Sequence, residues 1–124
     1  MEEKDITYQI RGALYDTYNA LGPGLLENVY EEVLCYYLTK RGLHFERQVE
    51  VPIYVEGHKL SSNLRLDLLV EKQVIIELKS VQEMKELFHL QIITYLKLAK
   101  LHRGILVNFN TSDFKNSIWN KVYG

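Results

Sequence analysis

The sequence predicts an α/β domain in which helices flank a mixed central β-sheet. Three observations support this fold class. Apolar residues recur at helical spacing through the first third of the chain and again at residues 87–101. The middle third changes to short runs with strand-type alternation. A last short apolar run, residues 104–109, follows the third predicted helix.

Length and composition fit a single packed domain over residues 1–124. Apolar residues make up 47% of the chain and charged residues 25%, which is typical of a globular protein. No apolar run approaches the roughly 20 residues that cross a bilayer. The acidic, polar segment that starts at Met1 does not resemble a secretory signal. Cys35 is the only cysteine, which excludes an internal disulfide and favours a reducing cytoplasm.

Two amphipathic helices are expected first. The apolar spacing predicts a helix over residues 5–21, which Gly22-Pro23-Gly24 ends with a tight turn. A second helix is predicted over residues 26–41, and Gly42 is a natural C-terminal stop.

Strands follow in the middle of the chain. Residues 45–55 are strand-like, and Glu56-Gly57 is typical of a hairpin turn. Residues 64–70 and 74–79 form two further strand-like runs.

The last part of the chain is expected to hold a helix and a strand. Residues 87–101 are apolar on most sides, so we expect a well-buried helix there. Residues 104–109 form the final predicted strand, and residues 110–124 are expected to be a polar tail.

The chemistry-bearing segment lies in the strand-like run of residues 74–79. Glu77 and Lys79 are two residues apart, so both project from one face of the strand. One interpretation is an active-site pair in the middle of an apolar strand. The alternative is the solvated face of an edge strand, because Glu-x-Lys is a common pattern.

Asp67, on the preceding strand, faces Glu77 only in one register. A three-residue loop from Glu71 to Gln73 pairs Val70 with Val74 and therefore puts Asp67 opposite Glu77. A two-residue loop would place the two carboxylates on opposite faces of the sheet. We predict the three-residue loop.

Two carboxylates this close repel each other and remain ionised together if a cation lies between them. Hard oxygen ligands favour Mg²⁺ or Mn²⁺. Such a metal polarises a phosphate oxygen and lowers the pKa of a bound water. Lys79 would then orient the attacking water and offset developing negative charge.

Three further polar residues accompany apolar helical faces. Glu27 precedes Tyr30 by three residues, and either supports a metal or favours the helix dipole at the N-terminus. Gln91 and Tyr95 lie one turn apart on the third helix. Gln91 either caps a core carbonyl or steadies the active site.

The remaining composition gives no competing site. The formal net charge of −1 neither supports nor excludes a nucleic-acid partner. None of the four histidines pairs with another at metal-ligand spacing, so no zinc site is predicted: His44, His58, His89 and His102.

Four ordered motifs resemble the GxxExxY proteins, a family assigned to the PD-(D/E)XK nuclease superfamily. Gly24-Leu25-Leu26-Glu27-Asn28-Val29-Tyr30 matches the naming motif at its three fixed positions. Residues 65–70 with 76–79 resemble the family's central block, residues 91–96 its Q-x-x-x-Y helix, and residues 104–109 its closing strand.

The resemblance implies a restriction-endonuclease-like core in which Asp67 and Glu77 bind a divalent metal. It implies a further metal ligand in the main-chain carbonyl of Leu78 and assistance from Glu27. Gln91 and Tyr95 would support the site. Leu66 stands where the superfamily name has proline.

We therefore expect a metal-dependent nuclease acting on DNA. The alternative is a catalytically silent module of the same fold that binds nucleic acid or protein, because the chain is small and nearly neutral. For such a module, a homodimer or a protein partner would supply additional binding surface.

Overall fold

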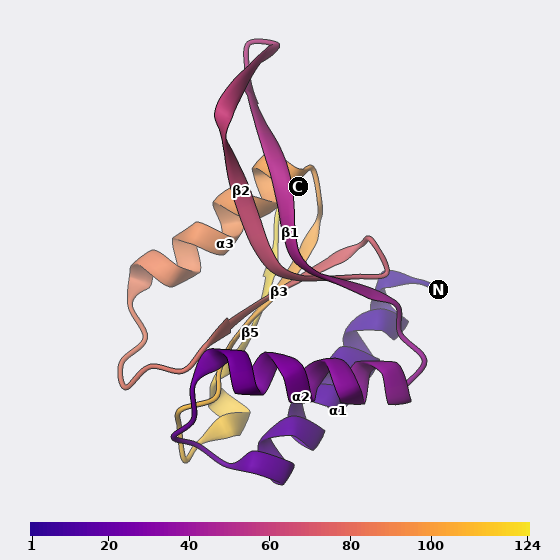
Figure 1. The fold of residues 1–124 in the computed structure, drawn as a ribbon, viewed down its shortest axis with the longest axis vertical. Coiled ribbons are helices and arrows are strands. Elements are labelled where there is room, and N and C mark those ends of the chain that lie inside the picture. Colours follow the sequence, from indigo (N-terminus) through magenta and orange to yellow (C-terminus); the bar gives the residue numbers. More distant parts are fainter.

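The computed structural model describes residues 1–124 and shows a mixed five-stranded sheet with helices on both faces (Figure 1). The elements in chain order are α1 (Glu3–Leu21), α2 (Glu27–Lys40), β1 (Phe45–Val55), β2 (His58–Val70), β3 (Val74–Lys79), α3 (Glu86–Ala99), β4 (Arg103–Asn108), the short 3₁₀ helix η1 (Phe114–Asn116) and β5 (Ile118–Val122). The predicted fold class is confirmed. No helix combines the length and apolarity needed to cross a membrane.

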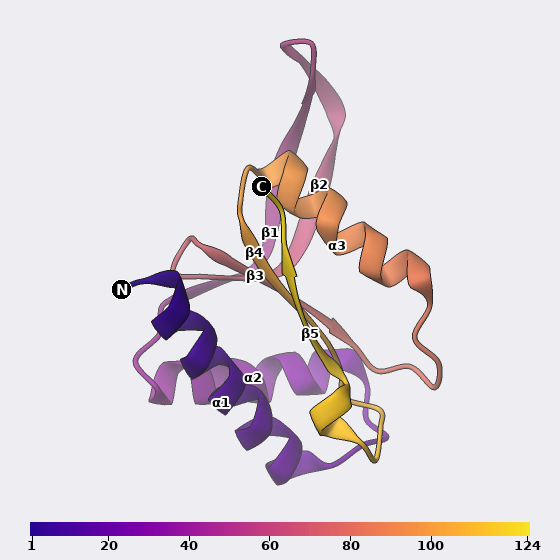
Figure 2. The ribbon, with the colours of Figure 1, turned by 180° about the vertical axis from the view of Figure 1, so that it is seen from behind.

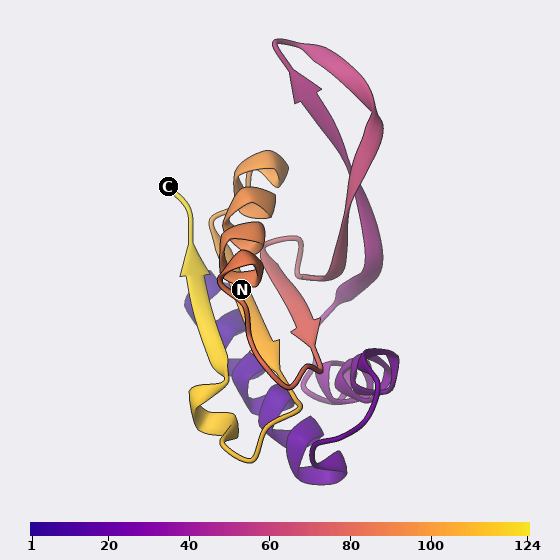
Figure 3. The same cartoon turned by 90° about the vertical axis from the view of Figure 1, so that its left-hand side faces the viewer.

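The strands lie in the order β1-β2-β3-β4-β5, so β3 is the central strand. All neighbours are antiparallel except β3 and β4, which are parallel and joined by α3. The β1–β2 hairpin extends well beyond the rest of the sheet as an arm (Figures 1 and 3). We call residues 51–63 of this hairpin the arm.

The two faces of the sheet are covered unequally. Helices α1 and α2 cover one face and α3 the other (Figures 2 and 3). Val74, Ile76 and Leu78 of β3 enter the main core with α1 and α2, while Ile75 points to the α3 side. The helical residues of the main core are fully buried or nearly so: Ile6, Ile10, Ala13, Leu14, Tyr30, Leu34, Cys35 and Leu38.

One predicted strand boundary and the predicted polar tail are wrong. Strand β2 begins at His58 rather than at residue 64, because its polar first half pairs with β1 in the arm. The expected polar tail instead forms η1 and β5, and β5 pairs with β4. An edge strand needs few buried side chains, so its sequence lacks a strong apolar alternation.

Helix α3 is also less buried than its apolar sequence predicts. Only Ile92 and Leu96 are buried, whereas Leu87 and Leu90 are 64% and 57% exposed. A single helix on one face of the sheet has no second layer over its outer side, so its outer leucines face solvent.

Tyr30 fixes the turn between α1 and α2. Its hydroxyl donates to the carbonyl oxygen of Gly22 at 2.6 Å and accepts from the Leu25 N–H at 3.2 Å. Its ring stacks on Phe109 with centroids 4.4 Å apart. Ser80, just after β3, donates a hydrogen bond to the carbonyl oxygen of Leu25. The turn that leads into α2 is therefore tied to the C-terminal end of β3.

Replacing Tyr30 by phenylalanine is expected to lower the free energy of unfolding by about 1–2 kcal/mol, because two backbone groups lose their partner while the stacking on Phe109 remains. Urea unfolding measures the change. Tyr36→Phe is the matched control, since Tyr36 is exposed and its hydroxyl makes no hydrogen bond. Equal stability of the two variants would contradict a role for the Tyr30 hydroxyl in the turn.

Candidate active site

Strands β2 and β3 part at two carboxylates. Their pairing runs from Val70–Val74 to Leu68–Ile76, which confirms the predicted three-residue loop. Beyond it, the Asp67 N–H donates to Oε2 of Glu77 at 2.8 Å, and the Leu78 N–H donates to Oδ2 of Asp67 at 2.8 Å. Side-chain oxygens thus replace backbone carbonyls across the gap and bring the two acids together, as the register argument predicts.

Strand β2 stays paired with β1, through Arg47–Leu68 and Val49–Leu66, and leaves β3 with it. Gln48, between those two pairs, has a positive φ of 49°, a conformation that non-glycine residues adopt rarely. This left-handed residue lies at the level of Asp67, where the carboxylate gap opens, and the β1–β2 register continues unchanged past it.

The surroundings of both carboxyl groups destabilise their ionised forms. Glu77 is only 8% exposed, and burial together with repulsion from Asp67 raises its pKa to about 8. Burial likewise raises the pKa of Asp67, although the hydrogen bond from the Leu78 N–H opposes the shift. The edge-strand alternative is wrong, because β3 is the central strand and Glu77 is buried.

Lys79 lies on the same side of β3 as Glu77. Its Nζ stands over the ring of Phe88, in the first turn of α3, 4.3 Å from the ring centroid. It makes no ion pair with either carboxylate. Its charge nevertheless acts to lower the pKa of both Asp67 and Glu77. The ammonium therefore lies close enough to act on the pKa values of both acids but forms no ion pair with them.

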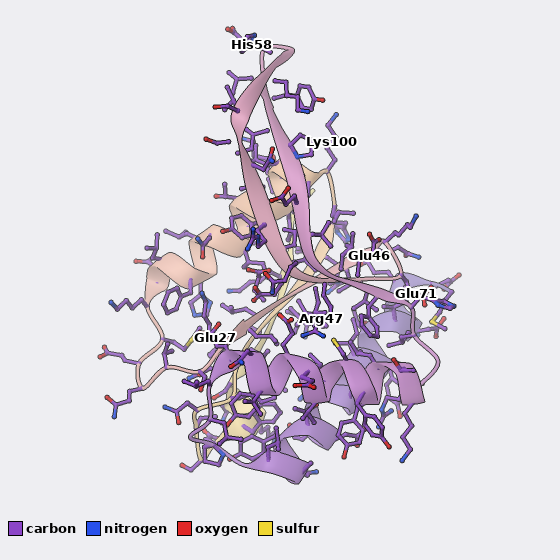
Figure 4. All side chains as sticks on the ribbon, in the orientation of Figure 1. Glu27, Glu46, Arg47, His58, Glu71 and Lys100 are labelled. Atoms are coloured by element: carbon purple, nitrogen blue, oxygen red, sulfur yellow. The ribbon has the colours of Figure 1, made fainter.

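Glu27 opens α2 beside a small cavity. Figure 4 shows it at the start of this helix. The cavity, of about 210 Å³, is lined by Glu27, Asn28, Glu31, Gln48, Asp67 and Leu78. The expectation that Glu27 lies on the buried apolar face of α2 with Tyr30 is wrong, because its side chain is exposed. It shares the cavity with Asp67 and also stands at the positive end of the α2 dipole, so the two interpretations of its role coexist.

Glu31 is a cavity residue that the sequence analysis missed. It is only 7% exposed, and Arg47 binds its Oε2 through Nε at 3.0 Å and Nη2 at 2.8 Å. The amide of Gln48 donates to its Oε1 at 2.7 Å. Glu31 follows Glu27 by four residues, a spacing that puts both acids on one face of a helix and would have indicated it. The conformation of Gln48 has no such signal in the sequence.

Gln91 and Tyr95 lie on α3, on the other side of the gap. Both are half-buried, and Tyr95 packs against the small cluster of Leu66, Ile75 and Leu96. Burial raises the pKa of the Tyr95 hydroxyl, and the charges of Glu77 and Asp67 raise it further. Gln91 makes no side-chain hydrogen bond within the chain, so it caps no core carbonyl.

Asn108 fixes the chain where it leaves the site. It is buried at the end of β4, opposite Lys79. Its Oδ1 accepts from the Val81 N–H at 3.1 Å, and its Nδ2 donates to the Val81 carbonyl at 3.0 Å. This clamp holds the segment directly after Lys79, although the sequence offered no reason to select Asn108.

The sequence model of the PD-(D/E)XK nuclease superfamily matches residues 4–121. The chain belongs to the PD-(D/E)XK nuclease superfamily. The match covers every helix and strand except the first residue of α1 and the last residue of β5. The α/β architecture with its mixed five-stranded sheet agrees with this family. No curated protein and no solved structure is significantly similar to the chain.

The donor set of this PD-(D/E)XK domain fits a small divalent cation. Asp67 and Glu77 each use one carboxylate oxygen for a backbone N–H, and the other oxygen makes no hydrogen bond within the chain. No three acidic, histidine or cysteine side chains are grouped closely enough to hold a metal ion. Mg²⁺ does not require such a cage, because it is commonly bound through one or two carboxylates and retains several waters.

Stability without divalent metal is expected to fall as the pH rises from about 4.5 to about 8. A carboxyl group with a raised pKa in the folded state contributes stability below its unfolded pKa, and this contribution is lost as pH rises through the folded value of about 8. Glu77→Gln, which keeps an oxygen for the Asp67 N–H, is expected to flatten this fall. Urea unfolding in EDTA at several pH values measures it.

Glu83→Gln is the matched control, because Glu83 is an exposed glutamate in the loop before α3. It is expected to leave the pH dependence of the free energy of unfolding unchanged. A Glu77→Gln variant with the same pH slope as the wild-type chain would show that burial of this carboxyl group does not set the slope.

Proposed function

We propose that the chain is a metal-dependent nuclease that hydrolyses phosphodiester bonds in DNA. One observation supports this above the others. Asp67 and Glu77 are held together at the centre of the sheet with raised pKa values and no ion-pair partner, and Lys79 lies beside them. Buried carboxyl groups whose ionised forms are destabilised in this way are typical of a functional site rather than of a structural ion pair.

Asp67 and Glu77 would hold Mg²⁺ or Mn²⁺, with the main-chain carbonyl of Leu78 as a further ligand and Glu27 assisting from α2. The cation, when bound, supplies a Lewis acid that polarises a phosphodiester oxygen and makes water a stronger nucleophile. Glu27 lies in the same cavity as Asp67 and Leu78, which supports its place in this set.

Lys79 would orient the attacking water and offset the negative charge that develops on the phosphate. The ammonium lies over the Phe88 ring at the end of a flexible side chain, which would allow it to move towards the substrate. Tyr95 and Gln91 would brace the site from α3. The charges of both carboxylates act on the Tyr95 hydroxyl, which supports its proximity to them.

Within the superfamily we assign the chain to the GxxExxY proteins. The contacts of Tyr30 give the motif a physical reason. Gly24 has a positive φ of 98°, the Tyr30 hydroxyl binds both sides of the turn, and Glu27 is thereby placed at the first turn of α2. We further propose a single domain over residues 1–124 and a cytoplasmic location. Burial raises the pKa of the Cys35 thiol to about 11, so this cysteine is an unreactive core residue.

Purified protein with Mg²⁺ or Mn²⁺ is expected to cleave at least one substrate in a panel of single-stranded, duplex and branched DNA. Glu77→Gln and Lys79→Ala are each expected to reduce the rate by at least roughly 100-fold, as for loss of a catalytic proton-transfer or charge-stabilising group. Lys72→Ala, in the exposed loop between β2 and β3, is the lysine control and retains activity. Cleavage that survives Lys79→Ala would exclude the proposed site.

Mg²⁺ is expected to stabilise the wild-type chain at pH 8, because a cation between Asp67 and Glu77 relieves their repulsion. The melting temperature with and without about 10 mM Mg²⁺ measures this effect. Asp67→Asn is expected to lose most of it. Asp113→Asn changes an exposed aspartate just before η1 that does not line the cavity beside Asp67, and it is expected to keep the effect. A Mg²⁺ effect of equal size in both variants would mean that the cation binds elsewhere.

A second candidate is a catalytically silent module that binds nucleic acid or protein. One observation favours it: Lys79 rests on Phe88 and makes no ion pair with the acids. Such a module would bind its partner and show no cleavage with any divalent metal. Sedimentation and pull-down experiments with inactive variants distinguish a homodimer or protein complex from a monomeric enzyme.

A further inference from the structure

A groove separate from the carboxylate gap lies between the arm and the C-terminal end of α3. It has a volume of about 540 Å³ and is lined by Tyr54, Gly57, Lys97, Leu98 and Lys100. Figure 4 shows Lys100 beside the arm and His58 at its tip. Lys59 is the cross-strand partner of Tyr54, so its side chain projects from the same face of the arm.

The groove is positively charged. Lys97 and Lys100 line it, Lys59 borders it, and none of the three forms an ion pair. No carboxylate lines it; Glu56, in the turn of the arm, is the nearest acid in sequence. In a chain with a net charge of −1, three unpaired lysines around one concavity select an anionic ligand.

Tyr54 adds a flat apolar face to this charge. Its side chain is 56% exposed, and no other aromatic ring stacks on it. Lysines alone attract any polyanion, but an exposed ring beside them binds a nucleobase by stacking. The face of a base is available for stacking only where it is unpaired, so the combination favours a single strand over a duplex.

The groove and the carboxylate gap lie along the same side of α3. Leu98 follows Tyr95 by three residues, so the two lie on the same side of α3 and are separated by about 5 Å along the helix axis. A strand that leaves the carboxylates past Tyr95 would therefore enter the groove without crossing the sheet.

We propose that this groove binds a single-stranded segment of the nucleic-acid substrate. Lys97, Lys100 and Lys59 contact its phosphates, and Tyr54 stacks on an unpaired base. The assignment rests on the proposed nuclease function for the identity of the ligand. It extends that function by specifying a substrate with a single-stranded part adjacent to the scissile bond.

Binding is measured without cleavage, by fluorescence anisotropy of the full chain in EDTA. The probes are a labelled DNA strand of roughly 20 nucleotides and the duplex of the same sequence, each titrated at several salt concentrations. The single strand is expected to bind more tightly. Tyr54→Ala is expected to weaken its binding by about fivefold or more, whereas Tyr54→Phe keeps the ring and the affinity.

The double variant Lys97→Gln/Lys100→Gln tests the phosphate contacts. It is expected to weaken single-strand binding and to reduce the slope of log affinity against log salt by about 1.4, the value for two lost contacts. Lys40→Gln/Lys115→Gln removes the same net charge from two exposed lysines outside the groove and is the matched control. It is expected to retain the wild-type slope.

The outcomes separate this proposal from the proposed function. Equal loss of binding in both double variants, or tighter binding of the duplex than of the single strand, would contradict the proposed role of the groove. Unchanged binding in Tyr54→Ala would also contradict the proposal that the groove binds a single strand. Tighter binding of anionic vesicles or polyglutamate than of the single strand would contradict it too. Metal-dependent cleavage that these groove variants leave unchanged would retain the nuclease and reject the groove. Groove-dependent binding without cleavage under any metal would retain the groove and reject the nuclease.

Discussion

The site depends on the exchange of backbone hydrogen bonds between Asp67 and the Glu77–Leu78 pair. Where β2 parts from β3, each strand would expose an unpaired N–H inside the protein. The two carboxylates accept these N–H groups at 2.8 Å, so the sheet remains satisfied although its ladder is interrupted. No buried side-chain polar atom in the chain lacks a partner. Each acid therefore serves the fold with one carboxylate oxygen and leaves the other oxygen free for the proposed chemistry.

This arrangement has an electrostatic consequence. Burial and mutual repulsion raise the pKa of both acids, and the hydrogen bonds and the Lys79 charge offset only part of that shift. The chain holds the pair in place through packing on both sides. Leu78 and Ile76 anchor β3 in the core with α1 and α2, and Tyr30 and Asn108 fix the turns that lead into and out of the site. Packing and backbone hydrogen bonds, rather than charge pairing, position these acids, so their ionised form is destabilised where they lie.

The sequence predicted the parts of the fold that periodicity controls. The first two helices, the three-residue loop after Val70 and the shared face of Glu77 and Lys79 follow from apolar spacing and strand register. Strand β5 was missed because it is a short edge strand whose burial is slight. Glu31 and Gln48 differ from each other in this respect. Glu31 follows Glu27 at helical spacing, which is a signal present in the sequence, whereas the left-handed conformation of Gln48 is set by tertiary contacts rather than by local propensity.

The unequal covering of the sheet connects the site to its surroundings. On the α1–α2 side the core is closed, and strand residues such as Leu68 and Val107 are fully buried. On the other side α3 stands alone, and the arm extends past its end (Figure 1). A second helix on this side would bury Leu87 and Leu90 but would also cover the approach to Lys79. The exposed apolar surface of α3 therefore follows from its position as the single helix on this side, while the strand residues beneath it remain buried.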